Sequence, residues 1–100
     1  MEEELLQIIN HYGINNQQRK LEEEVFELQE VITIYELKNS VQYEIPLTEL
    51  IATKEHLIEE CADVFVLLGQ ILHYYNIDTD ELNKMIDQKI KRQLERIKNE

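Results

Sequence analysis

Two short groups of acidic residues are the part of this sequence best suited to chemistry. The first places Glu24 and Glu27 three positions apart, and the second does the same with Glu60 and Asp63. On an α-helix this spacing puts both side chains of a pair on one face. Four converging carboxylates repel one another unless a cation lies between them, and such oxygen ligands suit Mg²⁺ or Mn²⁺. The pattern therefore predicts a divalent metal site on two helices, of a type that usually serves a phosphate-bearing substrate.

The composition favours long helices with few connections between them. The 100 residues include two glycines and one proline, which leaves little of the turn punctuation that a β or α/β fold requires. A chain of this length corresponds to a single domain, residues 1–100. Its apolar fraction of 43% fills only a modest core in a monomer. We therefore expect an all-α fold that is completed by homo-oligomerisation, as a homodimer or homotetramer.

The net charge of −11 argues against two classes of partner. Nucleic-acid binding depends on neutralising phosphates, and anionic membranes attract basic segments, so we expect neither partner. The charge is uneven, because six of the ten basic residues lie in the last seventeen positions. A single cysteine, Cys61, is typical of a reducing compartment, and an acidic start is unlike a signal peptide. These features predict a cytoplasmic protein.

The apolar periodicity predicts a short helix over about residues 2–12 and three long ones, over about 16–38, 46–76 and 79–97. Asn15 or Asn16, with Gln18, is expected to cap the second helix, and Asp78 with Glu81 the last. The expected architecture is a bundle of the three long helices with the short one leading. On the second helix the apolar seam is Leu21, Val25, Leu28, Ile32 and Tyr35. On the third helix it is Leu57, Cys61, Val64, Leu68, Ile71 and Tyr75.

Both acid pairs are expected at the edge of these seams. Acids that border a core must be paired, protonated or bound to metal. The only basic residue close on the same helical line is Lys20, and one lysine cannot neutralise four carboxylates. The alternative is a solvated or salt-bridged face, because each three-residue acid spacing is common on helices by itself. A di-iron site is not favoured, since it needs Glu-x-x-His on two helices and the sequence has none.

In combination the two motifs resemble a known family. Residues 20–27 read Lys-Leu-Glu-Glu-Glu-Val-Phe-Glu and residues 59–65 read Glu-Glu-Cys-Ala-Asp-Val-Phe. They resemble the all-α nucleoside triphosphate pyrophosphohydrolases. These are the MazG-like proteins, related to the dimeric dUTPases and to phosphoribosyl-ATP pyrophosphohydrolase. The shared signature is Glu-Glu-x-x-Glu followed by Glu-x-x-Asp on the next helix, and the resemblance covers residues 17–97. It implies Mg²⁺ held by Glu24, Glu27, Glu60 and Asp63, with Glu23 as an accessory acid.

The resemblance also implies phosphate contacts from basic residues. The family carries Asn-x-Lys-x-x-Arg-Arg on its last helix. Here Lys89 and Arg92 match, whereas Asp87 and Gln93 depart from the pattern. Lys20 matches a lysine that precedes the first motif in several members. The alternative for the basic stretch is favourable charge at a helix C-terminus.

The activity that the resemblance implies is Mg²⁺-dependent hydrolysis of a nucleoside triphosphate between its α- and β-phosphates. The products would be a nucleoside monophosphate and pyrophosphate, with Glu23 or Glu27 taking the proton from water. One alternative is an enzyme like phosphoribosyl-ATP pyrophosphohydrolase. Two others are a metal-dependent binder that sequesters nucleotides and a non-catalytic helical interaction or regulatory module. The motifs do not specify the base or the sugar.

Overall fold

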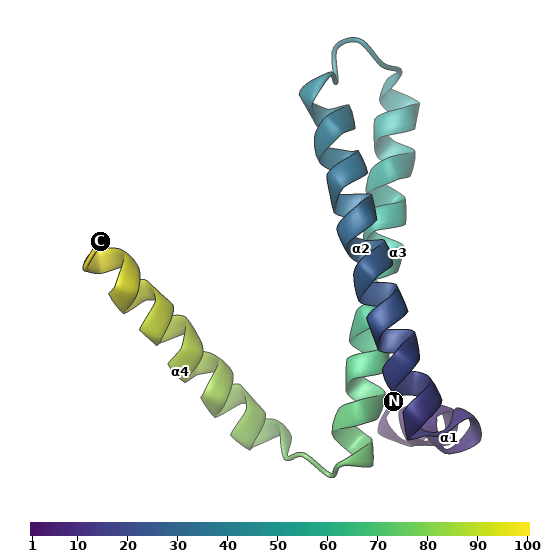
Figure 1. The fold of residues 1–100 in the computed structure, drawn as a ribbon, viewed down its shortest axis with the longest axis vertical. Helices are drawn as coiled ribbons and strands as arrows, with labels where there is room; N and C mark the ends of the chain where they lie inside the picture. Colours follow the sequence, from purple (N-terminus) through teal and green to yellow (C-terminus); the bar gives the residue numbers. More distant parts are fainter.

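The chain folds into four α-helices and contains no strand. The computed structural model describes residues 1–100, with α1 at Glu2–Tyr12, α2 at Ile14–Ser40, α3 at Leu47–Tyr74 and α4 at Thr79–Lys98. The predicted all-α class is therefore confirmed. Helices α2 and α3 form a long hairpin, α1 packs at the end opposite their connection, and α4 extends away from it (Figure 1). None of the four helices combines the length and the apolar character that crossing a bilayer requires.

The turn between α1 and α2 consists of a single residue, Gly13. Its φ of +90° lies in the region that favours glycine, because a side chain there would be strained. The chain re-enters a helix at once, so Gly13 is the N-cap of α2 and the predicted caps Asn15 and Asn16 lie inside the first turn. The Asn16 side chain instead donates a hydrogen bond to the carbonyl of Tyr12 at 2.7 Å. This contact ties the end of α1 to α2.

The seam between α2 and α3 contains acids, which corrects the sequence prediction. Its α3 line passes through Thr53, Leu57, Glu60, Val64, Leu67 and Ile71. Its α2 line passes through Gln17, Leu21, Glu24, Leu28, Val31 and Tyr35. Two neighbouring stripes on each helix can serve as a packing face, and the more apolar one was expected to be buried. Each helix is turned slightly from that arrangement: positions such as Leu28 and Val64 stay in the seam, and the predicted positions between them are replaced by the preceding residue. As a result Glu24 and Glu60 are enclosed, whereas Val25, Ile32 and Leu68 are exposed.

The apolar core of the single chain is thin. Only Ile9, Val31 and Leu67 are buried among the apolar residues. Ile9 lies where α1 meets the hairpin, and α1 approaches α3 closely at Gly69. A Cβ at this glycine would lie 3.0 Å from Cδ1 of Leu5, so the missing side chain permits the close packing. Helix α1 thus closes the hairpin end nearest to the acids.

Helix α4 makes no contact with the other three helices. Its N-cap is Asp78, as predicted, and the Asp78 side chain accepts a hydrogen bond from the backbone N–H of Asp80 at 3.0 Å, without the return bond from Glu81 that a capping box would add. Its large apolar side chains are exposed, namely Met85, Ile86, Ile90, Leu94 and Ile97. The expected bundle of three long helices is therefore not closed within one chain.

Candidate metal centre

Three of the four predicted acidic ligands meet in the seam. Glu24 from α2 and Glu60 and Asp63 from α3 each offer a carboxylate oxygen, and these oxygens lie within 4.8 Å of one another. Glu24 and Glu60 are buried, with exposed fractions of 7% and 8%, whereas Asp63 is exposed. The three form an acid cluster whose interior is shielded from water and whose Asp63 side is open. This arrangement lets an ion enter and lets a ligand reach it.

The two buried glutamates each have a basic neighbour at one oxygen and no hydrogen-bond partner at the other. Glu24 Oε1 lies 3.4 Å from Lys20 Nζ, and Glu60 Oε1 lies 3.5 Å from His56 Nε2. The second oxygen of each carboxylate, Oε2, is buried without a hydrogen-bond partner. A buried polar atom without a partner costs free energy, and a buried charge costs more. A hard divalent cation such as Mg²⁺ or Mn²⁺ would satisfy both oxygens, so the donor set fits such an ion.

The cluster also changes the proton affinity of its members. Burial raises the pKa of Glu60, and the neighbouring carboxylate of Glu24 raises it further. The negative charge of Glu24 raises the pKa of Glu27 as well. Hydrogen bonding to Glu24 raises the pKa of Lys20, which keeps that lysine charged. Without a cation the carboxylates therefore tend to retain protons, and a bound cation would displace them.

The structure does not bring the fourth predicted ligand, Glu27, into the cluster. Glu27 lies near Glu24, as its raised pKa reflects, but it is not one of the three acids that converge. It lines a shallow depression on the outer side of α2 together with Glu22, Glu23 and Phe26. The next turn of α2 carries Glu27 out of the seam. Both predicted proton acceptors, Glu23 and Glu27, are thus exposed beside the cluster.

The predicted phosphate-binding residues are divided between two places. Lys20 lies at the cluster, on the same cavity as Glu24 and Asp63. Lys89 and Arg92 are exposed on α4, which contacts no other helix of the chain. Within one chain, therefore, the two α4 residues have no route to the cluster.

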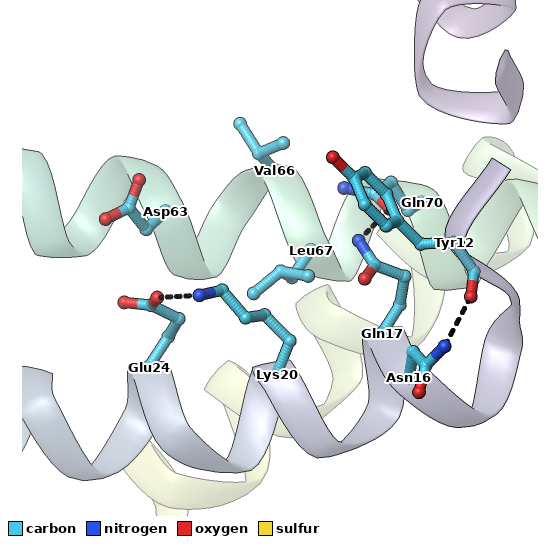
Figure 2. A pocket seen from close by; sticks show the side chains of 9 residues that line it. All are labelled: Tyr12, Asn16, Gln17, Lys20, Glu24, Asp63, Val66, Leu67 and Gln70. Carbon is cyan, nitrogen blue, oxygen red and sulfur yellow. Dashed lines mark hydrogen bonds and ion pairs between the residues drawn. The ribbon is translucent and has the colours of Figure 1, made fainter. Parts of the chain in front are cut away.

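A cavity of about 640 Å³ extends from the acid cluster toward α1. Lys20, Glu24 and Asp63 line one end, and Tyr12, Gln17 and Gln70 line the other (Figure 2). None of these last three residues was predicted to belong to the site. A signal was present, because Gln17 is seven residues before Glu24 and Gln70 is seven residues after Asp63. Each glutamine thus continues the acid-bearing line of its helix by two turns.

Comparisons with known proteins return no match of this chain to any family model, curated protein or solved structure.

Proposed function

We propose that this protein is a Mg²⁺-dependent nucleoside triphosphate pyrophosphohydrolase, cleaving between the α- and β-phosphates to give a nucleoside monophosphate and pyrophosphate. The observation that carries the proposal is the pair of buried, partnerless oxygens on Glu24 and Glu60, grouped with Asp63. The adjoining cavity, about 640 Å³, has a lysine beside the acids and lies in the size range of small-molecule sites. The order and spacing of the two motifs, which resemble those of the MazG-like family, support the same reaction.

Each residue of the site has a role in this proposal. Glu24, Glu60 and Asp63 would hold Mg²⁺, which when bound neutralises phosphate charge and lowers the pKa of water. Lys20 lies where it can exchange its contact with Glu24 for a phosphate oxygen. Glu27 is the better of the two proton acceptors, because its raised pKa brings it closer to neutrality. Glu23 adds negative charge beside it.

The proposal includes a homodimer or homotetramer in which α4 packs on another copy. The thin core and the exposed apolar side of α4 support it. Charge complementarity supports it too. Residues 84–98 carry six basic and two acidic side chains, whereas residues 1–83 carry four basic and eighteen acidic ones. Docking of this kind would bring Lys89 and Arg92 to the acidic surface of a second chain, where they could contact the phosphates.

A pair of variants on α4 tests the assembly. Ile90 belongs to the apolar side of this helix, and Gln88 lies nearly opposite it around the helix axis. We expect light scattering coupled to gel filtration to give a dimer or tetramer for the wild type and for Gln88→Glu, and a monomer for Ile90→Glu. A monomeric wild type would contradict the proposed assembly.

The activity itself is tested by pyrophosphate release with Mg²⁺ from a panel of nucleoside and deoxynucleoside triphosphates and phosphoribosyl-ATP. We expect turnover by the wild type and a loss of at least about a hundredfold in Asp63→Asn, since a metal contributes several kcal/mol to such reactions. Asp80→Asn is the matched control, because Asp80 is an exposed aspartate on α4. Release from phosphoribosyl-ATP alone would point to the related activity. Release from no substrate would contradict the proposal and favour a binding or interaction module.

A further inference from the structure

We propose that Gln17 and Gln70 form a base-recognition subsite at the end of the cavity away from the acid cluster. This inference rests on the proposed function, because it assumes that the ligand is a nucleotide. Both side chains are buried, with exposed fractions of 8% and 2%, and both line the cavity. Gln17 Nε2 donates a hydrogen bond to Gln70 Oε1 at 2.8 Å. This bond links α2 to α3 and holds the two amide groups side by side.

Each amide keeps one polar end for a ligand. The Gln17–Gln70 bond leaves the acceptor Gln17 Oε1 and the donor Gln70 Nε2 without a partner in the chain. Neither atom is among the fully enclosed polar atoms, so each keeps some access to solvent, and both residues line the cavity. An adjacent donor and acceptor match the Watson–Crick edge of a nucleobase, which proteins read by hydrogen bonds of this kind. The pair therefore presents one acceptor and one donor with which the edge of a base can form hydrogen bonds.

The position of the pair relative to the acids also suits a nucleotide. On α2 Gln17 precedes Glu24 by seven residues, and on α3 Gln70 follows Asp63 by seven. Because the two helices are antiparallel, both steps lead in the same direction, toward α1. Seven residues are two turns, or about 10 Å, which is comparable to the reach of a nucleoside from its phosphate to its base. A triphosphate at the acids would thus place its base at the amides.

Tyr12 adds an aromatic wall to this end of the cavity. It lies beside the amide pair (Figure 2), and its carbonyl accepts the hydrogen bond from Asn16 that ties it to α2. About half of the side chain is exposed, 56%, so a ring face is available to a planar ligand. Bases stack on aromatic side chains with little dependence on sequence. Tyr12 would therefore strengthen the binding of any base, and the amides would select among bases.

The competing explanation is that the amide pair only fastens α2 to α3. Equilibrium binding separates the two explanations without requiring turnover. The ligands are the α,β-methylene triphosphates of adenosine, guanosine, cytidine and uridine, with inorganic tripolyphosphate as the base-free probe, all with Mg²⁺. Gln70→Glu keeps the shape of the side chain and its acceptor for Gln17, but it replaces the free donor by an acceptor. Guanine is the base whose edge offers two adjacent donors, N1–H and N2–H.

We expect Gln70→Glu to shift the affinity ratio toward the guanosine analogue by at least about tenfold, because a mismatched polar site rejects the other bases. Tripolyphosphate affinity should stay the same. An unchanged ratio with intact folding would overturn the subsite, as would a wild type that binds the analogues no better than tripolyphosphate. Base-selective binding without turnover would count against the proposed reaction and leave the subsite standing.

Tyr12→Ser keeps the inference testable if Gln70→Glu does not fold. This exposed position tolerates the change. All four analogues should weaken by about fivefold or more relative to tripolyphosphate, because a stacking partner is lost. Tyr43→Ser is the matched control, since Tyr43 is 97% exposed in the connection between α2 and α3. Equal behaviour of the two variants would overturn the role of Tyr12 and the placement of the base.

Discussion

Two polar regions of the α2–α3 hairpin differ in whether the oxygens of their acids have partners. Near the connection between the helices, Lys38 Nζ lies 3.4 Å from Glu49 Oε1 and 3.1 Å from Thr53 Oγ1. Nearer to α1, Glu24 and Glu60 each bury an oxygen that has no hydrogen-bond partner in the chain. At the first region one lysine faces one acid, whereas at the second Lys20 lies at Oε1 of Glu24 and leaves Oε2 of both glutamates without a partner. The second region therefore has oxygens free to bind a cation from solution, as the proposed metal site requires, and the first region does not.

The largest expected effect on stability comes from removing one of the buried acids. Glu60→Gln should stabilise the metal-free protein by about 1–3 kcal/mol at neutral pH or above, because a buried charge beside Glu24 is replaced by a neutral amide. Glu49→Gln should instead destabilise it slightly, since Glu49 has Lys38 as a partner. Urea unfolding in the presence of a chelator measures the change in the free energy of unfolding for both variants. Destabilisation by Glu60→Gln would contradict the contrast between the two regions.

The pH dependence of stability should show the same contrast. The folded state raises the pKa of Glu60 above its ordinary value of 4.5, so just above that value the native state binds more protons than the unfolded state. The free energy of unfolding of the metal-free protein should therefore fall as the pH rises through this range. Saturating Mg²⁺ should weaken or reverse the slope, because metal binding requires deprotonated carboxylates.

The control for the pH experiment is Glu60→Gln. In the presence of a chelator, Glu60→Gln should remove the fall in the free energy of unfolding that Glu60 causes. Glu49→Gln should leave that fall in place. A wild-type profile that rises with pH in chelator across this range would show that burial does not control the protonation of the cluster.

The smallest expected effect comes from the region near the connection. Lys38→Met should cost less than about 1 kcal/mol, because Glu49 remains partly in water and exposed ion pairs contribute little. The Thr53 hydroxyl keeps its hydrogen bond to the carbonyl of Glu49 at 2.9 Å. Divalent metal affinity should not change. Thermal unfolding and a metal titration check the two parts, and a lowered metal affinity would mean that the regions are coupled.

The helices and the pairing of the acids were accessible from the sequence, because each depends on local spacing. The apolar period and the scarcity of glycine and proline specify helices. A three-residue step places Glu60 beside Asp63 whatever the tertiary packing. Helix α1 was predicted with the bounds that the structure shows.

The rotation of α2 and α3 was not accessible, because two neighbouring stripes compete on each helix. Apolar character favours burial of Val25 over Glu24, yet the structure buries Glu24. A prediction from apolar periodicity buries the more apolar stripe of a helix, so it does not find a buried stripe that carries acids. The buried glutamines were missed for a similar reason, since Gln is usually exposed. Helix α4 makes no contact with the other helices, so the expected bundle of three long helices was not found within the chain.

The most direct test of the central claim is a Mn²⁺ titration followed by the electron paramagnetic resonance signal of the free ion. Wild type and Glu49→Gln should deplete the free-ion signal alike, and Glu60→Gln should bind at least about tenfold more weakly, because it removes a cluster ligand. Equal binding by all three proteins, or no binding by the wild type, would contradict the assignment of Glu24, Glu60 and Asp63 as a metal centre.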